Sequence, residues 1–94
     1  MFEIERVDET RVRLRGRFDA SQEQTAKRFL DQIESSCVLD FEELTYMSSA
    51  GLGLLVALQL RLSREGKEVK LVNLNPHLRE LFRISGLDGV MQIE

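Results

Sequence analysis

The chain has 94 residues, with 13 Lys and Arg against 16 Asp and Glu, for a formal net charge of −3. Its length suits one domain, expected over residues 1–94, whose folding buries roughly 60 to 68% of the surface that the unfolded chain exposes. The lack of excess positive charge argues against a nucleic-acid partner, because such partners are held largely through cationic contacts to phosphates.

The first residues predict a β-hairpin. Charged residues alternate with apolar residues or glycine in 2–5 and in 12–17, as in half-buried strands, and the polar segment 8–10 joins them. The arginines of the second strand are expected to line one face and to form solvated cross-strand pairs with Glu3 and Glu5.

The next segment changes to a helical period. Apolar residues follow the i, i+3, i+4, i+7 pattern within 21–34, which predicts an amphipathic helix. Ser21 and Gln24 have the spacing of a capping box at its start. Asp19 falls in the turn before this helix, at the junction with the preceding strand.

A second strand and helix follow. The apolar residues of 38–44 are too continuous for a solvent-facing strand, which predicts a strand buried on both faces. A helix is expected over about 49–64, with Gly66 as its left-handed cap. Cys37, the only cysteine, cannot form an internal disulfide and is expected to be a small buried residue.

The last third predicts one more strand and helix. Residues 69–74 suit another buried strand, after which Asn75 caps a helix that has Pro76 in its first turn. This helix is expected to end at Gly86, and 90–93 predict a short last strand or a tail. No basic-then-apolar leader opens the chain and no apolar run approaches the roughly 20 residues that span a bilayer, so a cytoplasmic protein without membrane insertion is expected.

This order of elements predicts an α/β fold: a single domain whose mixed sheet combines the N-terminal hairpin with parallel βαβ strands, packed with helices. In parallel units, the carboxyl ends of the strands and the amino ends of the following helices gather at one edge. Asp19, the segment 48–51 and Asn73–Asn75 are therefore expected to be neighbours in space. We call this edge, defined by Asp19 and residues 48–51, the pole.

Catalysis at the pole is weakly supported. A nucleophilic serine needs a base, but the only histidine, His77, is expected to be exposed in the first turn of the third helix. Ser49 also lacks the glycine two residues before it that a nucleophile elbow requires. Neither a metal-ligand cluster nor a complete phosphate-binding glycine motif is present. The residues favour a binding protein with no catalytic residue, cofactor, metal or small-molecule substrate.

The two serines and the expected second helix indicate where a phosphate and a partner would bind. Ser48 or Ser49 is expected to cap the helix, and a phosphate there would lie at its positive end, at little cost to the fold. The helix has two apolar sectors, one of which must face the sheet. The other, with Leu52 and Val56, packs against the third helix or extends a docking surface from Ser49, and the exposure of these two residues separates the possibilities. The sectors are Leu54, Leu55, Leu58 and Leu62, and Leu52, Val56 and Leu60.

Four segments together resemble the STAS domain of bacterial anti-sigma factor antagonists over essentially the whole chain: "GRFD", "VLDFEELTYMSSAGLG", "VKLVNLNP" and "LFRISGL". The resemblance implies a phosphoacceptor serine at Ser49, with Ser48 as its rival where many members have Asp. It also implies that Asp19 lies beside the acceptor and supports its recognition. The expected partner-binding residues are Asp19, Ser48, Ser49, Ala50, Gly51, Leu52 and Val56.

The resemblance also implies the partners. The unphosphorylated form is expected to bind an anti-sigma factor that is also a serine kinase, phosphorylation at Ser49 to release it, and a separate serine phosphatase to reverse the change. The alternative is a STAS subunit bound to the ATPase of a lipid-type ABC transporter, or another non-phosphorylated STAS scaffold. Co-purification with an ATPase rather than a kinase would favour that alternative. A hydrolase activity lost in Ser49→Ala would instead revive an enzymatic role.

Overall fold

Two antiparallel strands open the chain, as the alternation of residues predicts. β1 (Phe2–Arg6) pairs with β2 (Arg11–Phe18), with Ile4 opposite Leu14. Asp8 closes the turn between them, because its Oδ1 accepts the backbone N–H groups of Thr10 and Arg11, each at 2.9 Å. The structure, a computed structural model, describes all residues from 1 to 94.

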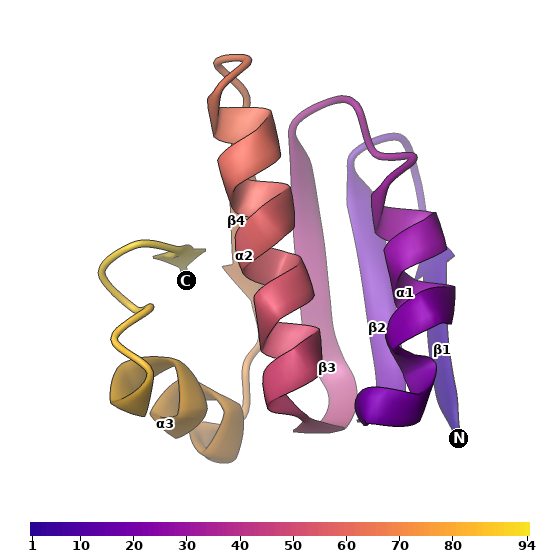
Figure 1. Cartoon of the computed structure of the whole chain (residues 1–94), viewed down its shortest axis with the longest axis vertical. Coiled ribbons are helices and arrows are strands. Elements are labelled where there is room, and N and C mark those ends of the chain that lie inside the picture. Colours follow the sequence, from indigo (N-terminus) through magenta and orange to yellow (C-terminus); the bar gives the residue numbers. More distant parts are fainter.

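Three further strands complete a mixed five-stranded sheet of order β1-β2-β3-β4-β5, in which β2 to β5 are parallel (Figure 1). This confirms the predicted single α/β architecture. The remaining elements, in chain order, are the 3-10 turn η1 (Ala20–Gln22), α1 (Glu23–Leu30), β3 (Cys37–Met47), α2 (Ser49–Ser63), β4 (Val69–Val72), α3 (Pro76–Ile84) and β5 (Gln92–Ile93).

Burial of β3 on both faces was a wrong prediction. The strands lie side by side in chain order, and right-handed crossovers that always step in the same direction leave the helices on one side of the sheet. Figure 1 shows α1 and α2 together over that side. β3 accordingly alternates: Leu39 and Phe41 are fully buried, whereas Asp40 points to the open face. β4 alternates in the same way.

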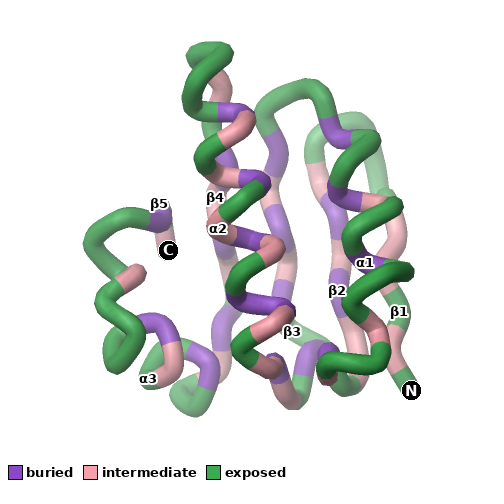
Figure 2. The backbone as a smooth tube through the Cα atoms, in the orientation of Figure 1, coloured by how far each residue is buried: buried purple, intermediate pink, exposed green.

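The buried side holds one apolar core of 21 residues, including Phe18, Phe41 and Phe82 (Figure 2). Cys37 belongs to it, and burial raises the pKa of its thiol. α1 ends at Leu30, earlier than predicted, although Ile33 is still fully buried. None of the helices has the length and apolar character that a membrane crossing requires.

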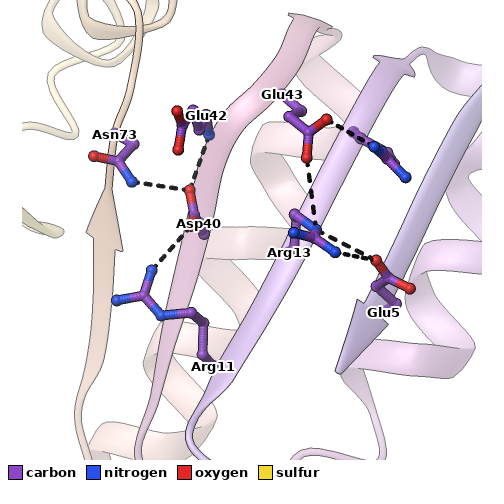
Figure 3. A network of polar contacts seen from close by, with 8 residues as sticks. Glu5, Arg11, Arg13, Asp40, Glu42, Glu43 and Asn73 are labelled. Carbon is purple, nitrogen blue, oxygen red and sulfur yellow. Dashed lines mark hydrogen bonds and ion pairs between the residues drawn. The ribbon is translucent and has the colours of Figure 1, made fainter. Parts of the chain in front are cut away.

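The open face carries ion pairs between neighbouring strands (Figure 3). Arg13 pairs with Glu5 of β1 at 2.7 Å, as the hairpin predicts. The arginines on either side of it turn the other way, because β2 also has β3 as a neighbour: Arg11 lies 2.9 Å from Asp40 and Arg15 lies 2.7 Å from Glu43. Burial acts to raise the pKa of Asp40, but hydrogen bonds from the Glu42 N–H, Asn73 and Arg11 outweigh it and hold that pKa below its usual value.

Candidate functional site

The ends of β2 and β3 place Asp19 beside Ser48. Phe18 and Met47 are register partners at the ends of these parallel strands, and the Ser48 N–H donates to the Phe18 carbonyl at 2.9 Å. Asp19 and Ser48 are therefore the first residues beyond two paired strands. These two residues therefore lie together at the pole, as the parallel arrangement predicts.

Asp19 stabilises the turn that leads into α1. Its Oδ1 accepts the Ser21 N–H at 3.1 Å and also the Ser21 hydroxyl. The predicted capping box of Ser21 and Gln24 was therefore wrong, because Ser21 lies inside η1 as a donor to Asp19 and α1 begins only at Glu23. The Ser21 hydroxyl holds the pKa of Asp19 below its usual value, with further help from Arg17 and the chain's amino group. Asp19 is thus a carboxylate at neutral pH.

The two serines have different places in the structure. Ser48 is the N-cap of α2 and half-buried, and its Oγ accepts the Gly51 N–H at 3.2 Å. Ser49 is the first residue of α2 and is exposed. Since the cap is provided by Ser48, the hydroxyl of Ser49 is left for the surface of the pole.

Two glycines of α2 differ in what surrounds them. A Cβ on Gly51 would lie 3.1 Å from both the Met47 side chain and the Phe18 ring, so glycine lets the first turn of α2 approach the strand ends closely. A Cβ on Gly53 would meet nothing within 4 Å. Glycine within a helix is less stable than alanine by about 0.5–1 kcal/mol, so Gly53 weakens α2 without a packing reason inside the chain.

The predicted division of α2 into two sectors was wrong for Leu52. Leu52 is only 7% exposed and shares the buried stripe with Leu55, Leu58 and Leu62, so its side chain is not available to a partner. Val56 is half-buried and Leu60 is 46% exposed. Because α2 is apolar almost all round, the helical period alone could not show which stripe faces the sheet.

Asn73 does not join the pole, whereas Asn75 lies nearer to it, bonded to Leu44 of β3, three residues before Met47. β4 ends at Val72, opposite Asp40 in the middle of β3, and at about 3.3 Å per residue this is roughly 20 Å short of Met47. The Asn73 Nδ2 donates to Asp40 on the open face at 3.1 Å, and the Asn75 Nδ2 donates to the Leu44 carbonyl at 3.3 Å. The strands end at different levels, which chain order alone does not reveal.

One feature near the pole was missed by sequence reasoning. The Arg17 guanidinium lies over the Tyr46 ring, 4.4 Å from its centroid. The two residues are register partners, so only the pairing of β2 with β3 could have revealed this contact. His77 is exposed in the first turn of α3, and no group of His, Cys, Asp and Glu in the chain is arranged to hold a metal ion.

Comparison with known proteins connects this geometry to a family. Residues 2–93 match the family model described as "Mlab, STAS domain". The anti-sigma-B factor antagonist of Listeria monocytogenes is 32% identical over 92 residues, covering 94% of this chain and 81% of that protein. BtrV of Bordetella bronchiseptica, described as a candidate anti-sigma factor antagonist, is 38% identical over 64 residues, covering 68% of this chain and 55% of the length of BtrV.

Two solved structures resemble this chain over its whole length. The Bacillus cell fate determinant SpoIIAA in its phosphorylated form is 25% identical with a TM-score of 0.72, covering 100% of this chain and 91% of that one. The anti-sigma factor antagonist SpoIIAA in its unphosphorylated form is 26% identical with a TM-score of 0.76, covering 100% and 88%.

Proposed function

The chain belongs to the STAS domain family, and from that premise we propose that it is an anti-sigma factor antagonist whose binding is switched by phosphorylation of Ser49. As a regulatory binding domain it binds an anti-sigma factor while Ser49 is unmodified. That partner is also the serine kinase that phosphorylates Ser49 and is then released. A serine phosphatase restores the binding form.

The observation that carries this proposal is that the two serines have different roles in the structure. Ser48 provides the cap of α2 through its bond to Gly51, while Ser49 is exposed beside it. A phosphate on Ser48 would remove the cap acceptor and lie in a half-buried position. A phosphate on Ser49 would extend from the first turn of α2, which contains no acidic residue and carries the positive end of the helix dipole. Ser49 is therefore the better acceptor.

Charge explains why the same phosphate would release a partner. Phosphoserine carries about −1.5 to −2 charges, and the pole already contains the ionised carboxylate of Asp19. In free protein, water solvates both groups. In a complex formed over the pole, both charges would be desolvated side by side, which is strongly unfavourable. A loss of about 2.7 kcal/mol is enough to weaken binding roughly hundredfold.

Phosphate mapping tests the acceptor. The protein and its Ser48→Ala and Ser49→Ala variants are incubated with ATP and the candidate kinases from its own source, and the products are mapped by mass spectrometry. Phosphate is expected in the parent and in Ser48→Ala, and to be absent in Ser49→Ala. Phosphate on Ser48 with an unmodified Ser49 would overturn the assignment.

Co-purification from the same source tests the partner. An anti-sigma factor with kinase activity is expected with the parent protein. Stable recovery of a transport ATPase, without phosphorylation of either serine, would instead support the transporter-subunit role and contradict the switch.

A further inference from the structure

The outward side of α2 differs from an ordinary surface helix. From Ser49 to Leu60 the helix has no charged residue, and Arg61 is the first. Ser49, Gly53 and Ala57 are spaced four residues apart and all are exposed, so they form one ridge along the helix. At about 1.5 Å per residue, this ridge extends about 12 Å from the Ser49 acceptor to Ala57.

Gly53, in the middle of the ridge, has open space around it. Neither space nor backbone conformation requires a glycine there, and alanine would make a more stable helix. A missing Cβ does allow another backbone to approach the helix closely. The ridge is therefore suited to a partner segment that lies directly on α2.

The ridge borders a groove between α1 and α2, the two helices that lie side by side in Figure 1. The groove has a volume of about 150 Å³, and Leu30, Leu54, Ala57 and Leu58 supply its apolar lining. Pockets for cofactors or drug-sized ligands are typically about 300–1,000 Å³, so this groove suits a single side chain. Ala57 keeps it open, because a larger residue there would occupy the space.

The rim of the groove indicates the charge of its occupant. Lys27 is paired with Asp31 at 2.8 Å, whereas Arg61 donates to the Leu30 carbonyl at 2.9 Å and has no carboxylate partner. The net charge of the chain is −3, but the two helices with their C-terminal caps carry more basic than acidic residues. The basic ones are Lys27, Arg28, Arg61 and Arg64, against Glu23 and Asp31. An acidic partner segment would complement this side.

We propose that the ridge and groove are a second contact for the anti-sigma factor: one segment of that partner lies over Gly53, places an aliphatic side chain in the groove beside Ala57, and directs a carboxylate to Arg61. This inference rests on the proposed function and names the chemistry that the partner must supply. The ridge begins at Ser49 and ends at the groove, so the partner would contact the acceptor and the groove at the same time.

Binding of the anti-sigma factor kinase from the protein's own source tests the proposal by titration calorimetry. Ala57→Leu fills the groove and is expected to weaken binding at least thirtyfold. Gly53→Ala is expected to weaken it about tenfold while raising the melting temperature. Arg61→Gln is expected to weaken it about fivefold and to reduce its salt dependence.

Two variants serve as matched controls. Gly89→Ala adds a Cβ in open space outside α2, and Thr25→Leu adds a leucine on an exposed part of α1 away from the groove. Both are expected to bind within twofold of the parent. Thermal unfolding of every variant checks that the fold is retained.

Phosphorylation kinetics add an independent readout. If the groove only anchors the partner, Ala57→Leu raises the KM for phosphorylation of Ser49 and leaves kcat close to that of the parent. Binding of Ala57→Leu and Gly53→Ala equal to that of the parent would overturn the groove contact and leave the proposed function standing. Failure of the parent itself to bind any anti-sigma factor would overturn both.

Discussion

α2 and α3 begin alike. Each follows a parallel strand of the mixed sheet and has a side-chain cap on its first turn: Ser48 accepts the Gly51 N–H at 3.2 Å, and Asn75 accepts the Leu78 N–H at 2.8 Å. Each also buries a stripe of large apolar residues in the same core.

Their outward sides differ. α3 exposes Arg79, Glu80 and Arg83, as is usual for a surface helix, whereas α2 is uncharged on the outside until its last turn. The fold requires only the inner side of each helix. What lies outside is free to vary, and we therefore interpret the uncharged outer side of α2, next to an exposed serine, as the proposed binding surface.

The inner sides provide the largest expected effect, and here the two helices should behave alike. Leu55 and Phe82 are both fully buried. Leu55→Ala is expected to lower the free energy of unfolding by about 2–5 kcal/mol and Phe82→Ala by about 3–5 kcal/mol. Urea denaturation measures both. A loss confined to one helix would show that the two do not share one cooperative core.

A negative charge at the amino end should affect partner binding in α2 but not in α3. Ser49→Asp places a negative charge in the first turn of α2 and is expected to weaken binding of the anti-sigma factor about hundredfold, or about 2.7 kcal/mol. His77→Asp makes a similar change in the first turn of α3 and is expected to alter binding less than twofold. Equal binding by Ser49→Asp and the parent, measured by titration, would refute the switch.

The close approach of α2 to the strand ends can be tested with its two glycines. Gly51→Ala forces a Cβ against the buried Phe18 ring and Met47, and is expected to lower the free energy of unfolding by about 1–3 kcal/mol. Gly53→Ala, in open space, is expected to raise it by about 0.5–1 kcal/mol. Opposite signs in thermal unfolding confirm the contrast, whereas a stabilising Gly51→Ala would contradict it.

Removing the cap of either helix should cause a smaller loss of stability, and the two losses should differ. Ser48→Ala and Asn75→Ala are each expected to lower the free energy of unfolding by about 0.5–2 kcal/mol. Asn75→Ala should cost more, because Asn75 also donates to the Leu44 carbonyl at 3.3 Å. Chemical denaturation of the two variants ranks them, and the reverse order would show that the bond to Leu44 contributes little.

The smallest expected effect is a change in thermal stability at acidic pH. The Arg83 side chain lowers the pKa of Glu80 in the folded state, so their pairing stabilises α3 above the unfolded pKa of about 4.3 and is lost as the pH falls through the folded pKa. The melting temperatures of the parent and Glu80→Gln should differ slightly at pH 6 and converge near pH 3. α2 has no acidic residue and should show no such loss. A difference that persists at pH 3 would point to a cause other than charge.

Local signals in the sequence were sufficient for much of the fold. The alternation of residues 2–5 and 12–17 identified the hairpin, and Asn75 with Pro76 identified the start of α3. Gly66 and Gly86 do adopt positive φ after the helices that they end. The adjacency of Asp19 and Ser48 followed from the parallel arrangement, because the ends of neighbouring parallel strands meet at one edge.

Where several local solutions were possible, the predictions stayed open or were wrong. Ser21 had a capping-box pattern, but Asp19 took its amide and hydroxyl. Either Ser48 or Ser49 could have capped α2, and the periodicity of an apolar helix fitted more than one buried stripe. The packing of Leu52, Leu55, Leu58 and Leu62 in the core, together with the close approach at Gly51, shows which side of α2 lies against the sheet.

The sequence by itself determined the elements, their order and the residues that begin and end most of them, because these depend on interactions within a few positions of the chain. The tertiary structure decided which face of the sheet is covered, at what level each strand ends, which serine is exposed, and that a groove opens between α1 and α2. These properties depend on strand order, register and packing between residues far apart in the chain, and no local pattern encodes them.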